Sequence, residues 1–332
     1  YGSTRRRRAL DHVVDRFLVR DPPAPARAAL RIGAHQLLDL GTPAHAAVSA
    51  TVSAAPKRYR GLVNAVLRKV AAAHEAGLTY PSPAIELSYP DWIVDRLETD
   101  LGPDRARAAL ETMNRPARVQ RRADGYVQDA SSQMVAELVP AEPGDLVLDL
   151  CAAPGGKATA LAGRGATVVA ADVRAGRVRL LVDNVDRLGL TDVLVVQADG
   201  TTPPFPAARF DAVLVDAPCT GLGALRRRPD ARWRIEPDAV DRLAALQGRL
   251  LCAAAPLVRP GGTLVYSVCT LTRAESVGVV ETVVGELAGL GLTLATDPPA
   301  VPWEPMADGV AVLVPGDDHD GMARAVWRSA AR

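Results

Sequence analysis

Residues 149–162, with the sequence DLCAAPGGKATALA, decide the fold of this chain. The short apolar run LVLDL at residues 146–150 leads into them, and a helical pattern begins at Ala158. A buried strand, a glycine-bearing turn and a helix N-terminus open a doubly wound α/β domain, where ligands bind at strand carboxyl ends. Gly155 and Gly156 lack a Cβ, so the backbone can adopt positive φ and approach a ligand closely.

The glycine pattern of this turn narrows the kind of ligand. It is not G-x-G-x-x-G, and it is not a Walker loop, because no G-x-x-x-x-G precedes Lys157. The pattern therefore argues against a dinucleotide or a nucleoside triphosphate and leaves a smaller nucleoside ligand. Lys157 has two interpretations from sequence: it holds a carboxylate or orients a catalytic acid, or it is a solvated loop lysine.

Strands and helices alternate after residue 146, which predicts a mainly parallel sheet with right-handed crossovers. Strand-like segments are found at residues 166–172, 192–199, 210–216 and 261–267, and helical ones at 174–188 and 237–258. Five residues with a carboxyl or thiol side chain lie at the ends of these strands or shortly after them: Asp172, Asp199, Asp216, Cys219 and Cys269. Because the carboxyl ends of parallel strands form the ligand edge, we expect these residues to share one site.

The composition indicates a cytoplasmic protein of two domains. The 332 residues are 48% hydrophobic, enough to fill two cores. The sequence contains no apolar run long enough to span a membrane and no signal-peptide apolar region. The four cysteines have no C-x-x-C spacing, which disfavours a metal site or a disulfide framework.

The first part of the chain is basic and helical. Residues 1–70 hold 13 Lys and Arg against 4 Asp and Glu, a net charge of +9, whereas the whole chain carries +1. Helical periodicity at residues 5–19, 25–40, 44–55 and 61–73 predicts an all-α module. The charge favours a polyanionic partner such as a nucleic acid, although arginines on solvated helix faces would give the same composition.

Three motifs in this order resemble the RsmB-like RNA cytosine-5 methyltransferases, which act on 16S ribosomal RNA. They are DLCAAPGGKATALA, DAPCTGLGALRRRPDARWR at residues 216–234 and GGTLVYSVCTLTRAES at residues 261–276. In addition, RAALRIGAHQLLDLGTPAHAAVSATVSAA followed by GLVNAVLRK resembles the later helices of a NusB-type RNA-binding domain. The first residue is not Met, so we expect this domain to be incomplete at its start.

The resemblance covers nearly the whole chain and implies its organisation. An all-α NusB-like domain is expected at residues 1–76, and a linker with a short helical subdomain at 77–125. A Rossmann-like α/β methyltransferase domain that uses S-adenosylmethionine is expected at 126–332. The family places a sizeable RNA-recognition subdomain after Asn114, and this chain has almost none there. Ribosomal RNA is the implied partner, and we expect a monomer.

The resemblance also implies roles for single residues. Cofactor contacts are expected from Cys151, Ala152, Ala153, Pro154, Gly155, Gly156, Lys157, Asp172, Arg177, Asp199 and Asp216. The implied catalytic residues are Cys269 as nucleophile, Cys219 for product release, Asp216 and Lys157. Spacing alone leaves both cysteines open to a packing role, Asp172 to a helix N-cap role, and Asp199 to an N-cap or turn role. For Cys151 and Cys252, packing is the simpler interpretation.

RNA contacts are expected from Arg58, Arg60, Arg226, Arg227, Arg228 and Arg232, with Trp233 as a stacking ring. A solvated loop around residues 226–234 is the alternative. Two positions depart from the family pattern: Val268 stands where Thr is usual before the nucleophile, and Ser276 replaces an Asn. Transfer RNA remains an alternative substrate, because phosphate contacts carry no sequence information. A non-catalytic RNA-binding or assembly factor is a further alternative, which the two retained cysteines disfavour.

Overall fold

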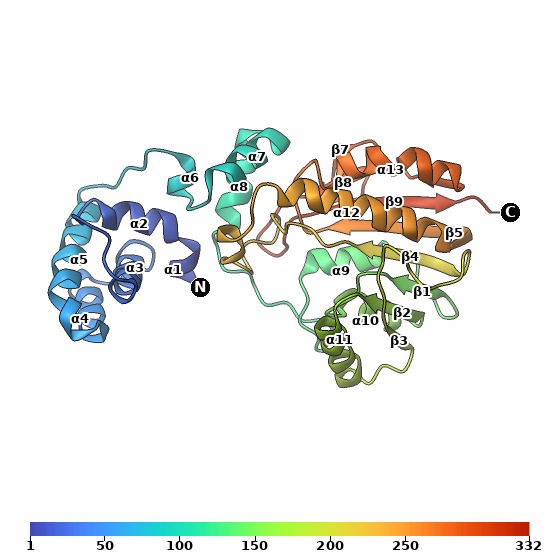
Figure 1. The fold of residues 1–332 in the computed structure, drawn as a ribbon, viewed down its shortest axis with the longest axis horizontal. Coiled ribbons are helices and arrows are strands. Elements are labelled where there is room, and N and C mark those ends of the chain that lie inside the picture. The colour runs from blue at the N-terminus through green and yellow to red at the C-terminus, as the bar shows by residue number, and fades with distance from the viewer. Residues whose placement is uncertain (332) are drawn as a thin grey trace. The chain divides into compact units, whose positions relative to one another are not determined.

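In the computed structural model, which describes residues 1–331, helices form the first part of the chain and a nine-stranded sheet organises the rest (Figure 1). The chain divides into two compact units. The helical unit contains Tyr1–Asp95 together with Arg228–Arg234, and the sheet unit contains the remaining described residues. The domain boundaries expected from sequence assign residues 228–234 to the catalytic domain, and these boundaries stay predictions.

The helical unit is built from amphipathic helices around one apolar core. Its helices are α1 (Gly2–Arg5), α2 (Arg7–Asp15), α3 (Ala24–Leu38), α4 (Ala44–Ala54), α5 (Arg60–Glu75) and α6 (Pro83–Glu86). Buried leucines and valines from α2, α3 and α5 meet in this core. A Cβ at Gly33 would lie 2.3 Å from Leu67 Cδ1, so a glycine at this position lets α3 and α5 approach closely.

The sheet unit begins with helices and then alternates strand and helix. Helices α7 (Asp91–Leu101), whose first residues belong to the helical unit, α8 (Pro103–Thr112) and α9 (Ala130–Glu137) come first. The alternating part then contains β1 (Leu146–Asp149), α10 (Gly156–Ala162), β2 (Thr167–Asp172), α11 (Ala175–Arg187), β3 (Val193–Gln197), β4 (Phe210–Asp216), α12 (Ala239–Ala254) and β5 (Val258–Val268). The α/β fold predicted from sequence is confirmed.

The strand order is β3-β2-β1-β4-β5-β9-β8-β7, with β6 paired to β9. Strands β1 to β5 pair in parallel with one another, whereas β5 pairs antiparallel with β9. The chain after β5 forms α13 (Val277–Gly289), β6 (Leu292–Leu294), β7 (Glu304–Ala307), β8 (Val310–Leu313) and β9 (Met322–Ser329). The order reverses at β1, and open α/β sheets bind ligands at such a switch point.

Both faces of the sheet are covered by helices. Alternate residues of each strand point to opposite faces, so Leu148 and Leu264 pack with α12 and α13, whereas Val147 and Val265 pack with α9, α10 and α11. Figure 1 shows these two helical layers on either side of the strands. Among the described residues, no helix is long and apolar enough to cross a membrane.

Candidate active site

The turn between β1 and α10 takes a backbone conformation that requires a glycine. Gly155 is the N-cap of α10 and has φ of +105°, in the left-handed region. A Cβ at Gly155 would also lie 2.6 Å from Leu181 Cδ1 of α11. Helix α11 fixes the turn from outside, because Arg177 donates to Ala153 O and Asn184 Nδ2 donates to Pro154 O at 2.8 Å.

Two of the predicted carboxylates lie at the ends of β2 and β3. Asp172, 4% exposed, ends β2, and its Oδ1 accepts from the Arg174 amide at 3.1 Å. Its Oδ2 lies 3.4 Å from Arg177 Nε. Asp199 follows β3 and is exposed, and hydrogen bonds from the Thr201 amide and hydroxyl lower its pKa. Both lie at the strand edge where the sequence predicts them.

Lys157 and Asp216 form an ion pair at the switch point. Lys157 Nζ lies 2.6 Å from Asp216 Oδ2, and Asp216 Oδ1 accepts from Ser267 Oγ at 2.7 Å. Burial of Lys157, 8% exposed, would lower the pKa of its ammonium, but the Asp216 carboxylate outweighs burial and raises it. Lys157 is therefore a charged partner of Asp216, and the alternative of a solvated loop lysine does not fit its burial.

A second buried carboxyl lies next to this pair. Asp149, the last residue of β1, is 1% exposed. Burial raises the pKa of Asp149 to about 7, the charge of Asp216 adds to this effect, and Lys157 opposes it. The Asp149 carboxyl therefore titrates near neutral pH. Asp149 has no role among the residues predicted from the sequence, although it ends the apolar run that predicts β1.

Two of the four cysteines meet at the carboxyl ends of β4 and β5. Cys219 Sγ lies 3.2 Å from Cys269 Sγ. The hydrogen bond shared with Cys269, together with burial, raises the pKa of the Cys219 thiol well above its usual value. Cys219 is therefore a protonated thiol at neutral pH. The structure brings together the two cysteines that the sequence predicts at this edge.

The other two cysteines have no such partner thiol. Burial raises the pKa of Cys151, which follows β1. Burial and the nearby Glu286 raise the pKa of Cys252 on α12 to about 11. A thiol needs to lose its proton to act as a nucleophile, so neither environment activates its cysteine. Both placements are consistent with the packing interpretation.

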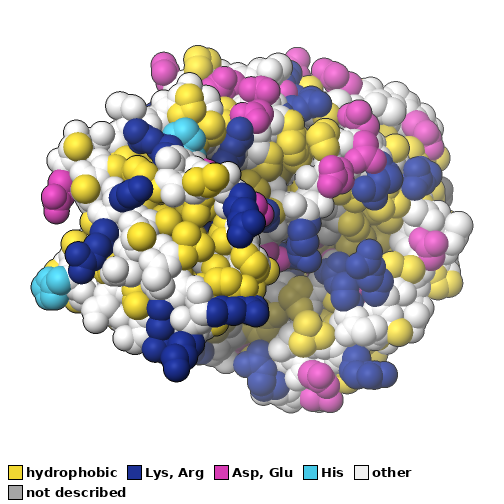
Figure 2. All heavy atoms as spheres, turned by 60° about the vertical axis from the view of Figure 1, so that its left-hand side comes forward, with side chains coloured by type: hydrophobic (Ala, Val, Ile, Leu, Met, Phe, Trp, Pro, Cys, Tyr) yellow, Lys and Arg dark blue, Asp and Glu magenta, His cyan; other side chains and the backbone are white. Residues whose placement is uncertain are grey.

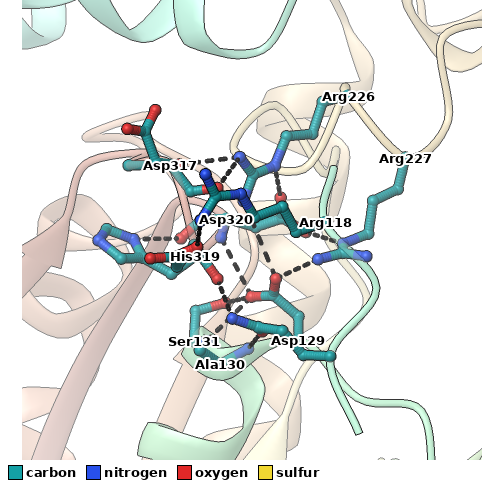
Figure 3. A network of polar contacts seen from close by, with 12 residues as sticks. Arg118, Asp129, Ala130, Ser131, Arg226, Arg227, Asp317, His319 and Asp320 are labelled. Carbon is teal, nitrogen blue, oxygen red and sulfur yellow. Dashed lines mark hydrogen bonds and ion pairs between the residues drawn. The ribbon is translucent and has the colours of Figure 1, made fainter. Parts of the chain in front are cut away.

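The loop after Cys219 is anchored by a buried charge network, drawn in Figure 3. Arg226, 3% exposed, donates through Nε to Asp320 Oδ1 at 2.5 Å and through a second nitrogen to Gly316 O at 2.8 Å. Arg227 Nε donates to Asp320 Oδ2 at 2.5 Å, and Arg227 also pairs with Asp129, the N-cap of α9. Because Arg226 is buried and paired in this way, it does not fit the predicted contact with an RNA phosphate. The guanidinium of Arg227 is likewise engaged, by the carboxylates of Asp129 and Asp320.

Arg232 also differs from its predicted role. It is 0% exposed within the helical unit, and its guanidinium lies 3.8 Å from the centre of the Tyr89 ring. It donates to Arg5 O at 3.3 Å and to Ser88 O at 3.2 Å. Burial lowers its pKa to about 10. A side chain enclosed in this way does not fit contact with an RNA phosphate.

The neighbouring Trp233, predicted as a stacking ring, is also held within the protein, because its indole Nε1 donates to Thr4 O at 2.8 Å. By contrast, Arg58 and Arg228 are exposed. Arg60 is exposed as well, but its guanidinium donates to Ala55 O at 3.2 Å and to Ser53 O at 2.7 Å. The Arg58 guanidinium lies 4.6 Å from the centre of the Tyr59 ring. Figure 2 shows Lys and Arg side chains spread over the face that it presents, with most Asp and Glu toward its upper part.

The structure shows where the two residues that depart from the family pattern lie. Val268 is the last residue of β5 and is fully buried. Ser276 precedes α13, and its hydroxyl donates to Thr272 O at 2.7 Å. Both residues therefore support the loop that carries Cys269. Sequence reasoning missed two further residues here, Ser267 and Glu275, because neither stands out in composition or spacing.

Family models match both parts of the chain. A model described as 16S rRNA methyltransferase RsmB/F matches residues 136–319, and the NusB family model matches residues 1–72. The chain belongs to the RsmB/F family of 16S rRNA methyltransferases. The prediction of an RNA methyltransferase with a NusB-like N-terminal part is confirmed.

Curated relatives agree with this assignment. Ribosomal RNA small subunit methyltransferase B of Thermus thermophilus is 37% identical over 99% of this chain and 86% of its own length. A probable ribosomal RNA small subunit methyltransferase B of Synechocystis sp. is 33% identical over 85% of this chain and 78% of its own length. Both relatives thus match through most of their length.

Two solved structures share the fold. PH0851 superposes with a TM-score of 0.73 at 22% identity, covering 98% of this chain and 87% of its own. NSun6 from Pyrococcus horikoshii, solved with SFG, has a TM-score of 0.55 at 30% identity and covers 62% of this chain and 53% of its own. SFG is an analogue of S-adenosylmethionine, and S-adenosylmethionine is the cofactor of this RsmB/F family member.

Proposed function

We propose that this protein methylates C5 of a cytosine in 16S ribosomal RNA through a covalent adduct between Cys269 and C6 of the base. The observation that carries the proposal is the 3.2 Å approach of Cys219 Sγ and Cys269 Sγ at the strand edge that also holds Lys157 and Asp216. Methyltransferases that act on a more nucleophilic atom need no cysteine there. Two cysteines at one edge fit the chemistry of C5.

A cysteine nucleophile can overcome the low reactivity of C5 of cytosine. Attack of the Cys269 thiolate on C6 saturates the 5,6 bond and gives C5 enamine character, a case of covalent catalysis. Lys157 faces this step with a positive charge, and its interaction with Cys269 is one of the contributions that raise the pKa of Lys157. We therefore propose that Lys157 lies close enough to Cys269 to act in this step.

We propose that Asp216 contacts the edge of the cytosine base. Its two oxygens are fixed by Lys157 and Ser267, so the carboxyl is oriented before the substrate binds. A preorganised polar group stabilises charge that develops on the ring more effectively than one that must reorient. We propose that the Asp216 carboxyl hydrogen-bonds at N3 of cytosine, and that the Lys157 ammonium, which keeps its proton, orients this carboxyl.

Cys219 is suited to the last step. S-Adenosylmethionine supplies an electrophilic methyl group, and the C5 proton must then leave so that the bond between Cys269 and C6 breaks. The raised pKa of Cys219 makes its thiolate a strong base once formed. We propose that the Cys219 thiol gives its proton to the departing Cys269 sulfur, which leaves with the electron pair of the C6–S bond, and that the resulting Cys219 thiolate takes the C5 proton, directly or through water.

The residues at the strand edge suit the cofactor. Its ribose hydroxyls and adenine amino group are donors, and Asp172 and Asp199 are acceptors at the ends of β2 and β3. A carboxylate at the end of the second strand accepts from ribose hydroxyls in nucleotide-binding folds. We propose Asp172 for the ribose and Asp199 for the adenine. The turn from Cys151 to Gly156 would hold the methionine part, with Arg177 fixing that turn.

The helical unit is proposed to bind the RNA substrate through exposed cations, among them Arg58, Arg60 and, beyond residue 70, Arg228. Bisulfite mapping of ribosomal and transfer RNA, from cells with and without the gene, tests substrate and product together. The proposal expects one cytosine in 16S ribosomal RNA to lose its methyl group. If a methyl group is lost from transfer RNA alone, transfer RNA is the substrate of the same reaction. If neither RNA loses a cytosine methyl group, the proposal is wrong.

A further inference from the structure

A buried carboxylate lies behind the two cysteines and contacts the loops that carry them. Glu275, 0% exposed, stands between β5 and α13. Its Oε1 accepts from the Thr220 amide at 2.8 Å, and its Oε2 accepts from the Thr220 hydroxyl at 2.5 Å. Thr220 directly follows Cys219, so Glu275 fixes the backbone of the first cysteine loop.

The same carboxylate contacts the second cysteine loop. Its Oε2 accepts from Thr272 Oγ1 at 3.0 Å and from Thr270 Oγ1 at 3.2 Å, and Thr270 directly follows Cys269. The hydroxyls of Thr220 and Thr270 also lie 3.1 Å apart. Two loops separated by fifty residues in sequence therefore share one carboxylate.

Helix α12 completes the network from the other side. Gln247 Nε2 donates to Glu275 Oε1 at 3.2 Å and to Pro218 O at 2.8 Å. The Tyr266 hydroxyl lies 2.6 Å from Glu275 O and 3.0 Å from Gln247 Oε1. All these side chains are buried, and buried polar groups that are fully hydrogen-bonded hold a unique arrangement.

We propose that Glu275 is a positioning residue that sets the separation of Cys219 and Cys269. The role of the two thiols in catalysis rests on the proposed function, whereas the geometric role of Glu275 does not. Donors from both loops and from α12 converge on two acceptor oxygens. An apolar residue at this position would leave the Thr220 amide without its acceptor and Gln247 with Pro218 O alone, and the loops would lose their common anchor.

Charge and geometry can be separated at this position. Glutamine keeps the length of the side chain and one acceptor oxygen, and the threonine hydroxyls can rotate to accept from its amide. Alanine removes the anchor altogether. If geometry is the role of Glu275, Glu275→Gln should behave much more like the native protein than Glu275→Ala does. Glu281→Gln, an exposed position on α13, is the matched control.

The experiment measures kcat, KM and thiol alkylation against pH for these three variants and the native protein. Glu275→Ala is expected to lower kcat by about 100-fold with KM little changed, because small displacements of reacting groups have effects of this size. Alkylation of Cys219 is expected to extend to lower pH, since its hydrogen bond with Cys269 is what chiefly raises its pKa. Glu275→Gln should keep most of kcat, and Glu281→Gln should match the native protein.

Native kcat and a native alkylation profile in Glu275→Ala would overturn the proposal. If that variant does not fold, Thr220→Val tests the same contact, because it removes the hydroxyl and nearly preserves the shape. It should lower kcat and shift Cys219 alkylation in the same direction, and unchanged values would count against the positioning role. Thiol alkylation requires no methyl transfer, so it tests Glu275 even if the native protein makes no 5-methylcytosine, a result that would overturn the proposed function alone.

Discussion

Cys219 Sγ and Cys269 Sγ lie 3.2 Å apart although fifty residues separate them in the sequence. The sheet causes this approach, because β4 and β5 are parallel neighbours and each cysteine follows the carboxyl end of its strand. Their loops are also joined directly, since the Gly223 amide donates to Cys269 O at 3.0 Å. The pair is thus a product of topology and loop anchoring together.

Cys269→Ala is expected to abolish methyl transfer to RNA, by about 10⁴-fold or more, because the step that activates C5 is lost. Cofactor affinity should stay near the native value, since the turn at Gly155 is untouched. The measurement is incorporation of labelled methyl groups into RNA, with equilibrium binding of S-adenosylmethionine beside it. Cys252→Ala, a cysteine on α12 away from the strand edge, is the control and should remain active.

Cys219→Ala is expected to accumulate a covalent protein–RNA adduct, because Cys269 forms its bond to C6 while release is slowed. A denaturing gel should show a shifted band that depends on S-adenosylmethionine and disappears in the Cys219→Ala, Cys269→Ala double variant. A Cys219→Ala protein that turns over at the native rate without a shifted band would remove the release role of Cys219.

Asp149 is expected to make stability depend on pH. Its folded-state pKa of about 7 lies above the value of about 3.9 in an unfolded chain, so the folded state holds its proton more tightly. This contribution to stability is complete below about pH 4 and is lost as the pH rises through about 7, at most about 4 kcal/mol. Asp149→Asn should therefore gain thermal stability relative to the native protein between these values. A constant difference across the range would contradict this assignment.

Arg226→Ala is expected to destabilise the protein by about 3 kcal/mol, because it leaves Asp320 and Asp129 buried with less compensating charge. Arg228→Ala, two residues along and exposed, should change stability by less than about 0.5 kcal/mol. Chemical denaturation of both variants measures the difference. Equal, small effects would mean that Figure 3 shows contacts of little energetic weight.

Arg58 and Arg60 are expected to bind RNA through phosphates. Replacing both by alanine should reduce the slope of log K against log salt by about 1.4, or about 0.7 per lost contact to a single strand. Arg328→Ala, an exposed arginine in the sheet unit that pairs with Asp297, is the control and should leave the slope unchanged. An unchanged slope in the double variant would place the RNA elsewhere.

The parallel half of the sheet was predictable because its signals are local. An apolar run, a glycine turn and a helical period lie within a few residues of one another around Gly155. The antiparallel strands β6 to β9 were not predicted. For β7 the reason is local, because this edge strand is four residues long and contains Pro305, and so short a segment carries little periodicity.

The arginines show where sequence reasoning reaches its limit. A run such as Arg226–Arg228 is basic in composition whether it faces RNA or is buried. The partners that decide the matter, Asp320 for Arg226 and Tyr89 for Arg232, lie far away in the sequence. Glu275 was missed for the same reason, because its hydrogen-bond donors come from separate parts of the chain. Local patterns located the strand ends, and only the fold revealed which side chains they bring together.

The location of the covalent bond in the trapped protein–RNA complex shows directly whether Cys269 is the nucleophile. Cys219→Ala protein is incubated with substrate RNA and S-adenosylmethionine, digested with protease and nuclease, and analysed by mass spectrometry. We expect a peptide that contains Cys269 and carries the mass of a methylated cytidine nucleotide. A nucleotide attached to any other residue, or none attached to Cys269 while methylation proceeds, would contradict the role of Cys269 as nucleophile.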